Sequence, residues 1–123
     1  MEAAKKKTLV LGASDNPERY SYLAVNRLRG KDYPVVAIGG KKATVSDVEI
    51  TTEKPPFKDI DTVSIYLNPA HQPAYYQYIL SLNPKRIIFN PGAENPVFYN
   101  MALEKGIKPM EACTLVLLST GQY

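Results

Sequence analysis

Apolar runs of strand length alternate with segments of helical periodicity along the chain. Four runs have the apolar character of strands buried on both faces: Thr8–Leu11, Val35–Ile38, Thr62–Leu67 and Arg86–Phe89. Ile107–Ala112 is a predicted fifth strand. Pro109 within it indicates a sheet edge, because proline has no N–H to donate to a neighbouring strand.

Three further segments carry the apolar spacing and the end signals of helices: 21–29, 73–82 and 95–106. Ser21 is expected to cap the first helix, with Gly30 directly beyond its end. Pro73 fits the first position of the second helix. Asn95-Pro96 opens the third helix, and Gly106 closes it.

Strands that alternate with helices indicate an α/β domain, a doubly wound Rossmann-like parallel sheet of about five strands with helices on both faces. Counted along the chain, the expected order is 3-2-1-4-5, which places residues 107–112 at an edge. Residues 45–50 are either a short excursion or an added strand, and 114–123 a last helical turn or coil. The 123 residues are expected to form a single domain, residues 1–123.

Composition fits an ordinary globular protein, with 45% hydrophobic and 22% charged residues. Cys113 is the single cysteine, so an internal disulfide is excluded and a reducing cytoplasm is expected. The start around Lys5–Lys7 predicts no signal peptide, and no apolar stretch predicts a membrane span. The net charge of +3 slightly favours an anionic ligand, but the dispersed lysines do not predict nucleic-acid binding.

The turn Gly12–Pro17 leads from the first strand towards the first helix. Its small residues leave backbone N–H groups and a helix N-terminus free to face a phosphate. Ligands of such sheets bind beyond the carboxyl ends of the strands, here near a switch point expected between the first and fourth strands. Four loops should converge there: Gly12–Ser21, Gly39–Lys42, Asn68–Gln72 and Asn90–Glu94.

This turn departs from the dinucleotide fingerprint, because Ser14 and Pro17 stand where the second and third glycines belong. Asp32 has roughly the spacing of the ribose-binding acid but precedes the second strand. Lys41 and Lys42 follow that strand and suit a ribose with an extra phosphate, as in NADP or coenzyme A. Two lysines at an exposed turn fit simple solvation about equally well.

Catalytic signals are weak. His71, the single histidine, is expected to be a loop or cap residue, and Cys113 a buried structural thiol. Glu94 and Glu111 have no evident partner for paired-carboxylate chemistry, and the sequence contains no metal-ligand cluster. Three tyrosines crowd one helix and indicate core packing or a subunit interface: Tyr75, Tyr76 and Tyr78.

The pattern Gly12-Ala13-Ser14-Asp15-x-Pro17-x-Arg19-x-Ser21-Tyr22 resembles the opening motif of the small bacterial CoA-binding proteins. These are similar to the CoA-binding domain of the succinyl-CoA synthetase α subunit. The likeness continues through the basic turn after the second strand, Asp61–Tyr66, Asn90-Pro91-Gly92 and Cys113, and so covers most of the chain. The chain departs from the family pattern at Ile38-Gly39-Gly40.

The resemblance implies a Rossmann-like fold with a coenzyme A site. The diphosphate would lie near Gly12–Ser14 and Arg19–Ser21, and the 3′-phosphate near Lys41 and Lys42. The loops after the third and fourth strands would flank the adenine and pantetheine portions. The expected cofactor-binding residues are Gly12, Ala13, Ser14, Asn16, Arg19, Tyr20, Ser21, Gly39, Gly40, Lys41, Lys42, Asn68, Pro69, Gln72, Asn90, Pro91, Gly92 and Ala93.

The leading hypothesis is therefore a protein that binds coenzyme A or an acyl-CoA without catalysis, as a carrier, sensor or regulator. One alternative is an NADP- or other nucleotide-dependent enzyme subunit. Another is an oligomeric interaction module whose pocket has decayed. The expected partners are a CoA-type small molecule and either a second copy of the chain or another protein, with no nucleic acid and no membrane.

Overall fold

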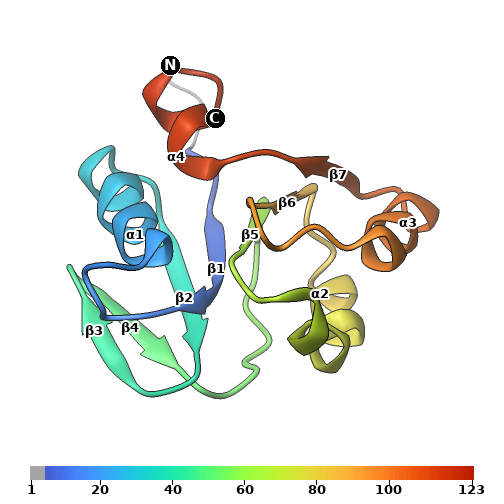
Figure 1. Cartoon of the computed structure of the whole chain (residues 1–123), viewed down its shortest axis with the longest axis horizontal. Coiled ribbons are helices and arrows are strands. Elements are labelled where there is room, and N and C mark those ends of the chain that lie inside the picture. Colours follow the sequence, from blue (N-terminus) through green and yellow to red (C-terminus); the bar gives the residue numbers. More distant parts are fainter. Residues whose placement is uncertain (1–4) are drawn as a thin grey trace.

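The computed structural model describes residues 5–123 as one mostly parallel sheet with helices on both faces. Seven strands run in the order β3-β4-β2-β1-β5-β6-β7 (Figure 1). Neighbouring strands are parallel except for β3 and β4, which form an antiparallel hairpin. The strands are β1 Thr8–Ala13, β2 Val35–Gly39, β3 Ala43–Val45, β4 Val48–Thr51, β5 Thr62–Ile65, β6 Arg86–Phe89 and β7 Lys108–Glu111.

The predicted five-strand order 3-2-1-4-5 is wrong. The strand at 62–65, expected beyond β2, pairs with β1 instead, with Leu9 opposite Val63. The place beyond β2 belongs to the β3–β4 hairpin, where Ala37 lies opposite Ile50. The hairpin takes this edge because Val45 and Ile50 are both buried in the sheet's core, so the irregular stretch contains added strands rather than an excursion.

Arg29, in the last turn of helix α1 (Tyr20–Gly30), fastens the hairpin. Its Nε and Nη2 donate to the two carboxylate oxygens of Asp47 at 2.8 Å each, and its Nη1 donates to the backbone oxygen of Tyr33. The guanidinium lowers the pKa of the Asp47 carboxyl by donating to it. Planar bidentate contact fixes direction as well as distance, so this pair orients the hairpin turn against α1.

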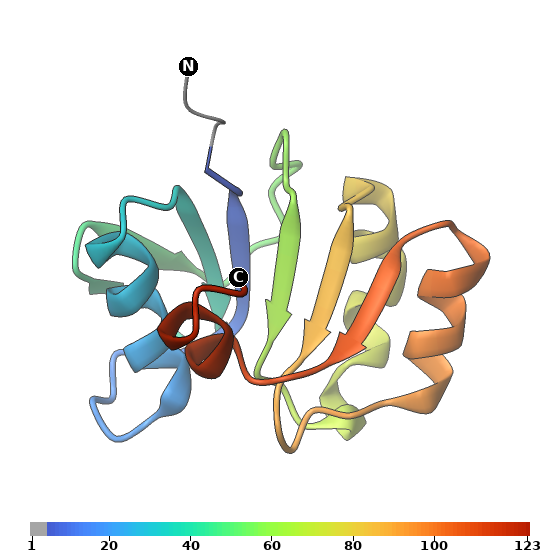
Figure 2. The ribbon, with the colours of Figure 1, turned by 90° about the horizontal axis from the view of Figure 1, so that it is seen from above.

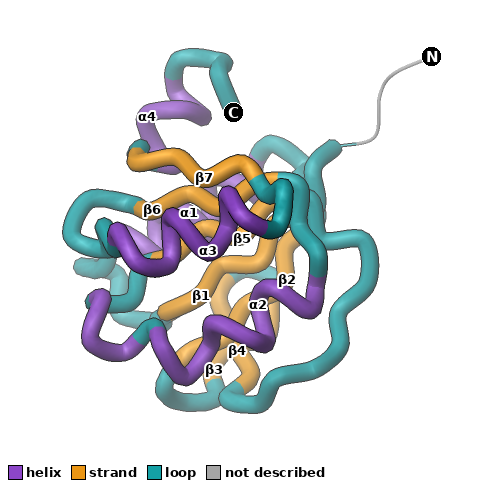
Figure 3. The backbone as a smooth tube through the Cα atoms, turned by 90° about the vertical axis from the view of Figure 1, so that its right-hand side faces the viewer, coloured by secondary structure: helices purple, strands orange, loops and turns teal. Residues whose placement is uncertain are grey.

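Helices cover both faces of the sheet, as predicted. Helices α1 and α4 (Thr114–Ser119) pack on one face, where Val10, Val25 and Leu118 share a core. Helices α2 (Tyr76–Leu82) and α3 (Pro96–Glu104) pack on the other face, in front of the strands in Figure 3. Alternate residues of a strand point to opposite faces, which places Leu9 and Val10 in different cores.

Some of the helix ends lie where the sequence predicts them, and others do not. Asn95 caps α3 by accepting from the amide of Phe98 at 3.0 Å, and Gly106 follows it with φ +74°, both as predicted. The predicted Ser21 cap is wrong, because Arg19 is the N-cap of α1. Gly30 is the last residue of α1 rather than the one beyond it. The segment expected as one helix from Pro73 begins as a 3₁₀ turn, η2 (Pro73–Tyr75), after a separate turn, η1 (Pro69–His71).

The last strand and the C-terminal residues agree with the sequence-based predictions. β7 lies at the sheet edge that Pro109 predicted. The tail forms α4, and Tyr123 beyond it is buried against Tyr33, with its hydroxyl bonded to Thr8. Within residues 5–123, no helix is long and apolar enough to cross a bilayer.

Candidate functional site

The parallel strands β1, β2, β5 and β6 end beside one cleft of about 610 Å³. Figure 2 shows the arrowheads of β5, β6 and β7 pointing the same way, so the loops after parallel strands gather at one end. The switch point lies between β1 and β5, the first and third predicted strands, and not between the first and fourth. The cleft is lined by Gly12, Ala13, Ser14, Arg19, Tyr20, Ser21, Gly40, Lys41, Tyr66, Leu67, Asn68 and Pro91.

The four predicted loops therefore each contribute to one cleft. Tyr66 and Leu67 line it as well and were missed. The sequence predicts Leu67 as the end of a strand, but β5 ends at Ile65 and both residues lie beyond it. The position of Leu67 before the loop at Asn68 is the sequence signal that could have identified it.

Gly12 lines the cleft from the end of β1. It sits at a bulge in β1, where Leu11 pairs with Ile38 but Ala13 pairs with Gly39. Its φ is +87°, and a Cβ there would lie 3.0 Å from the backbone nitrogen of Leu67. Glycine alone fits this conformation and this close approach without strain, so the turn can bring β1 against the end of β5.

The loop after β1 is braced by its own polar groups. The Ser14 hydroxyl accepts from the amide of Asn16 at 3.0 Å, and the Asn16 carbonyl oxygen accepts from the amide of Glu18 at 3.0 Å. The amide of Arg19 donates to the backbone oxygen of Asn16. Asn16 does not line the cleft. Its side chain instead stabilises the loop after β1.

This bracing starts α1 at the edge of the cleft. Within residues 5–123, the backbone amides of Tyr20 and Ser21 donate no hydrogen bond. Ser21 is 3% exposed, with its backbone at the first turn of the helix. Free N–H groups and the positive end of an eleven-residue helix favour an anion at this point.

Positive charge reaches the cleft from two sides. Arg19 lines it from the start of α1, and Lys41 lines it from the loop after β2. The Lys41 amine lies 3.5 Å from the carboxylate of Asp15 in the loop after β1, and the two side chains are 76% and 41% exposed. Lys42 borders a different hollow beside the β3–β4 hairpin, so the structure separates the two predicted lysines.

Gln72 is buried and does not line the cleft. It is 0% exposed, and its amide nitrogen donates to the backbone oxygens of Leu67 at 3.0 Å and Ala93 at 2.8 Å. Its carbonyl oxygen accepts from Asn95 at 2.9 Å. Both polar atoms of the Gln72 side chain therefore bond to buried partners. These bonds link the loop after β5 to the loop after β6.

Asn90 holds a comparable buried position. Its amide donates to Ser64 and to the backbone oxygen of Ile65, and its carbonyl oxygen accepts from the amide of Thr114. The remaining predicted residues do not line the cleft: Gly39 ends β2, Pro69 begins η1, and Gly92 and Ala93 lie in the loop after β6.

The candidate catalytic groups do not assemble at the cleft. His71 is exposed at the end of η1, and Cys113 at the start of α4 is half-buried rather than buried as expected. The hydroxyl of Tyr66 is buried without a hydrogen-bond partner, and burial raises its pKa. Among residues 5–123, no group of three or more His, Cys, Asp or Glu side chains could hold a metal ion.

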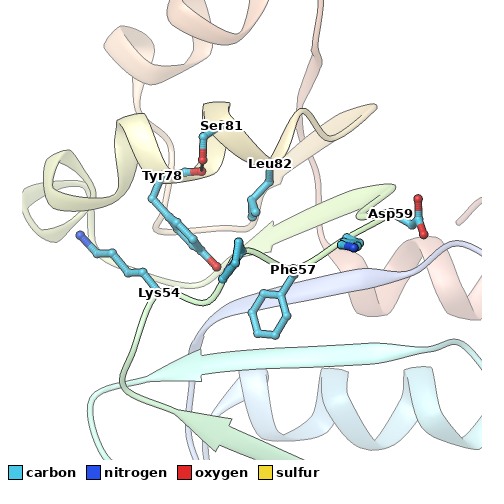
Figure 4. A pocket seen from close by; sticks show the side chains of 8 residues that line it. Lys54, Phe57, Asp59, Tyr78, Ser81 and Leu82 are labelled. Carbon is cyan, nitrogen blue, oxygen red and sulfur yellow. Dashed lines mark hydrogen bonds between the residues drawn. The ribbon is translucent and has the colours of Figure 1, made fainter.

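A further hollow, of about 490 Å³, lies between the 54–59 loop and α2. Figure 4 shows Tyr78 reaching from α2 towards this loop. The Tyr78 hydroxyl donates to the backbone oxygen of Pro55 at 2.6 Å, and burial raises its pKa to about 12. The Lys54 amine donates to the backbone oxygen of Ala74. These two bonds hold the loop against α2 and η2. Because the polar groups of this hollow already bond to the protein, the cleft at the strand ends is the better candidate site.

Comparison with protein families finds one match that spans nearly the whole chain. The model of the CoA binding domain family matches residues 6–119. Comparison with curated proteins finds no match.

Solved structures give the same architecture. A crystal structure of an uncharacterized protein is 46% identical, with a TM-score of 0.95, and the match covers 98% of this chain and 100% of that one. Cell-free ID.343 from Thermus thermophilus is 22% identical, with a TM-score of 0.80, over 97% and 91% of the two chains. A hypothetical protein from Pyrococcus horikoshii OT3 is 22% identical, with a TM-score of 0.84, over 94% and 83%. The last two likenesses show the fold alone.

Proposed function

Because this chain belongs to the CoA binding domain family, we propose that it binds coenzyme A or an acyl-CoA in the cleft beyond β1 and β5. The observation that carries the proposal is the unpaired start of α1, where the amides of Tyr20 and Ser21 lie beside the Gly12 turn. A diphosphate needs such donors in a site that backbone can approach closely. The role is that of a carrier, sensor or regulator in a reducing, cytoplasmic setting.

The charges of the cleft suit the other anionic group of the ligand. Arg19 and Lys41 lie on its two sides, and a 3′-phosphate would be held by Lys41. Asn68 and Pro91 line the part nearest β5 and β6, where the pantetheine arm would leave. An incoming phosphate competes with Asp15 for Lys41, since that carboxylate is its present partner.

We propose binding without chemistry because of what faces the ligand. Within the described residues, the cleft lining includes no His, Cys, Asp or Glu. General acid–base catalysis most often uses such a group, although lysine and tyrosine also serve. Of these, Lys41 is paired with Asp15, the Tyr66 hydroxyl is buried, and Tyr20 is exposed at the rim. Any reaction on the bound thioester would thus be supplied by another protein.

The decisive test is calorimetry of the purified protein with coenzyme A, with native mass spectrometry to identify any co-purified ligand. We expect saturable binding of one ligand per chain. No heat and no change in thermal midpoint at millimolar ligand would overturn the proposal. Tighter binding of NADP than of coenzyme A would instead favour the nucleotide-dependent enzyme subunit, because Lys41 after β2 also suits the 2′-phosphate of NADP.

The two lysines give a matched pair of variants. Lys41→Ala should weaken coenzyme A by about fivefold, roughly 1 kcal/mol for an exposed charge, and should weaken 3′-dephospho-CoA much less. Lys42→Ala should leave both affinities nearly unchanged, because its side chain borders the hairpin hollow. Calorimetry of the two variants with both ligands measures this. Equal losses for the two ligands in Lys41→Ala would contradict the placement of the 3′-phosphate.

A further inference from the structure

Tyr20 is an aromatic side chain without a structural partner. It is 69% exposed, more than Val97 at 62% or Leu103 at 54%. It belongs to neither hydrophobic core, and within residues 5–123 its ring makes none of the described aromatic or cation–π contacts. A single exposed aromatic residue is ordinary on a protein surface, but Tyr20 also lines the cleft, where its free ring can meet a ligand.

The backbone of the same residue fixes where its ring can act. Tyr20 is the first residue of α1, and its amide is one of the two free donors that face the proposed diphosphate. A ring attached to that residue lies within a few bonds of the phosphate position. The ring would thus be within reach of the adenosine that coenzyme A carries on one side of its diphosphate.

We propose that Tyr20 is the stacking platform for the adenine base, and so the residue that selects ligands with a nucleotide end. The inference deepens the proposed function and rests on it. Base–aromatic stacking is a recurrent way to hold a base without reading its edge. The base is the one flat aromatic group of coenzyme A, whereas the pantetheine arm is a flexible chain that gains little from a flat ring.

Other candidates for this task are less available. Tyr66 also lines the cleft, but its hydroxyl is buried and its ring packs with the core on the α1 face. Arg19 precedes Tyr20 and is exposed, so its guanidinium can add a charge contact to the same nucleotide. No other aromatic residue lines the cleft within the described chain.

The test compares Tyr20→Ala and Tyr20→Phe with Leu103→Ala, an exposed apolar control on α3 outside the cleft. Calorimetry uses coenzyme A and 4′-phosphopantetheine, which lacks the nucleotide. We expect Tyr20→Ala to weaken coenzyme A about tenfold and 4′-phosphopantetheine less than twofold. Tyr20→Phe and Leu103→Ala should stay within twofold of wild type for both. NMR of bound coenzyme A should show upfield shifts of the adenine protons that Tyr20→Ala removes.

Each outcome decides something. Unchanged coenzyme A binding by Tyr20→Ala, or equal losses for the two ligands, overturns the platform while the proposed function stands. A change of oligomeric state with no change of affinity also overturns it and assigns Tyr20 to an interface. Failure of the wild-type protein to bind coenzyme A overturns the proposed function and the platform together.

Discussion

Replacing Gly39 by alanine is expected to lower the free energy of unfolding by about 3 kcal/mol, as overpacking of a rigid contact does. A Cβ at this position would lie 2.2 Å from the backbone oxygen of Ala13 and 2.9 Å from a methyl carbon of Ile50. Neither neighbour can easily move, since Ala13 is held in β1 next to its bulge and Ile50 is 3% exposed. The strand ends must therefore separate.

Gly40 provides the control for this change at the next position. A Cβ at Gly40 meets no heavy atom within 4 Å, so Gly40→Ala should change stability by less than about 0.5 kcal/mol. Urea unfolding of the two variants measures the difference. Because Gly39 supports the Ala13 backbone beside the cleft, Gly39→Ala should also weaken coenzyme A where enough protein remains folded. Equal stability of the two variants would contradict the close approach of β1 to β2.

Gln72→Leu is the second change with a large expected effect, about 3 kcal/mol of lost stability. Leucine keeps much of the volume but removes the donor to two backbone oxygens and the acceptor for Asn95. Buried groups left without partners each cost on the order of 1–3 kcal/mol. Part of that loss is recovered where the backbone oxygens of Leu67 and Ala93 can rotate towards water. The expected total is therefore smaller than the sum of the costs of the separate groups.

Gln77→Leu tests the same substitution on the exposed surface of α2. It should stay within about 0.5 kcal/mol of wild type in urea. The folded fraction of Gln72→Leu should bind coenzyme A less tightly, because the loops carrying Leu67 and Pro91 lose their tie. A stable Gln72→Leu protein with wild-type affinity would show that these loops are held by other contacts.

Local signals in the sequence predicted much of the fold. Asn95 and Gly106 mark the ends of α3 through their own capping chemistry, which acts within a few residues. Pro109 marked an edge because the missing N–H excludes a central strand whatever its neighbours are. The predicted Ser21 cap failed because the loop from Ser14 to Glu18 is braced by its own hydrogen bonds and starts the helix earlier.

The location of the candidate site also followed from sequence, since parallel strands bring their carboxyl ends to one edge. The sequence did not predict which side chains face that edge. Gln72 and Asn90 are polar residues of the right loops, yet both turn inward to bond buried backbone and side chains. Lys41 and Lys42 are adjacent, yet only Lys41 lines the cleft.

The sequence by itself determined the alternation of strands and helices, the glycine at the end of β1 and the edge at β7, because each depends on residues that are neighbours in the chain. The tertiary structure alone decided that the hairpin at 43–51 pairs with β2 and that β5 pairs with β1. It also decided which loop residues face the cleft. Strand pairing and side-chain direction depend on contacts between segments far apart in the chain, and local composition does not encode them.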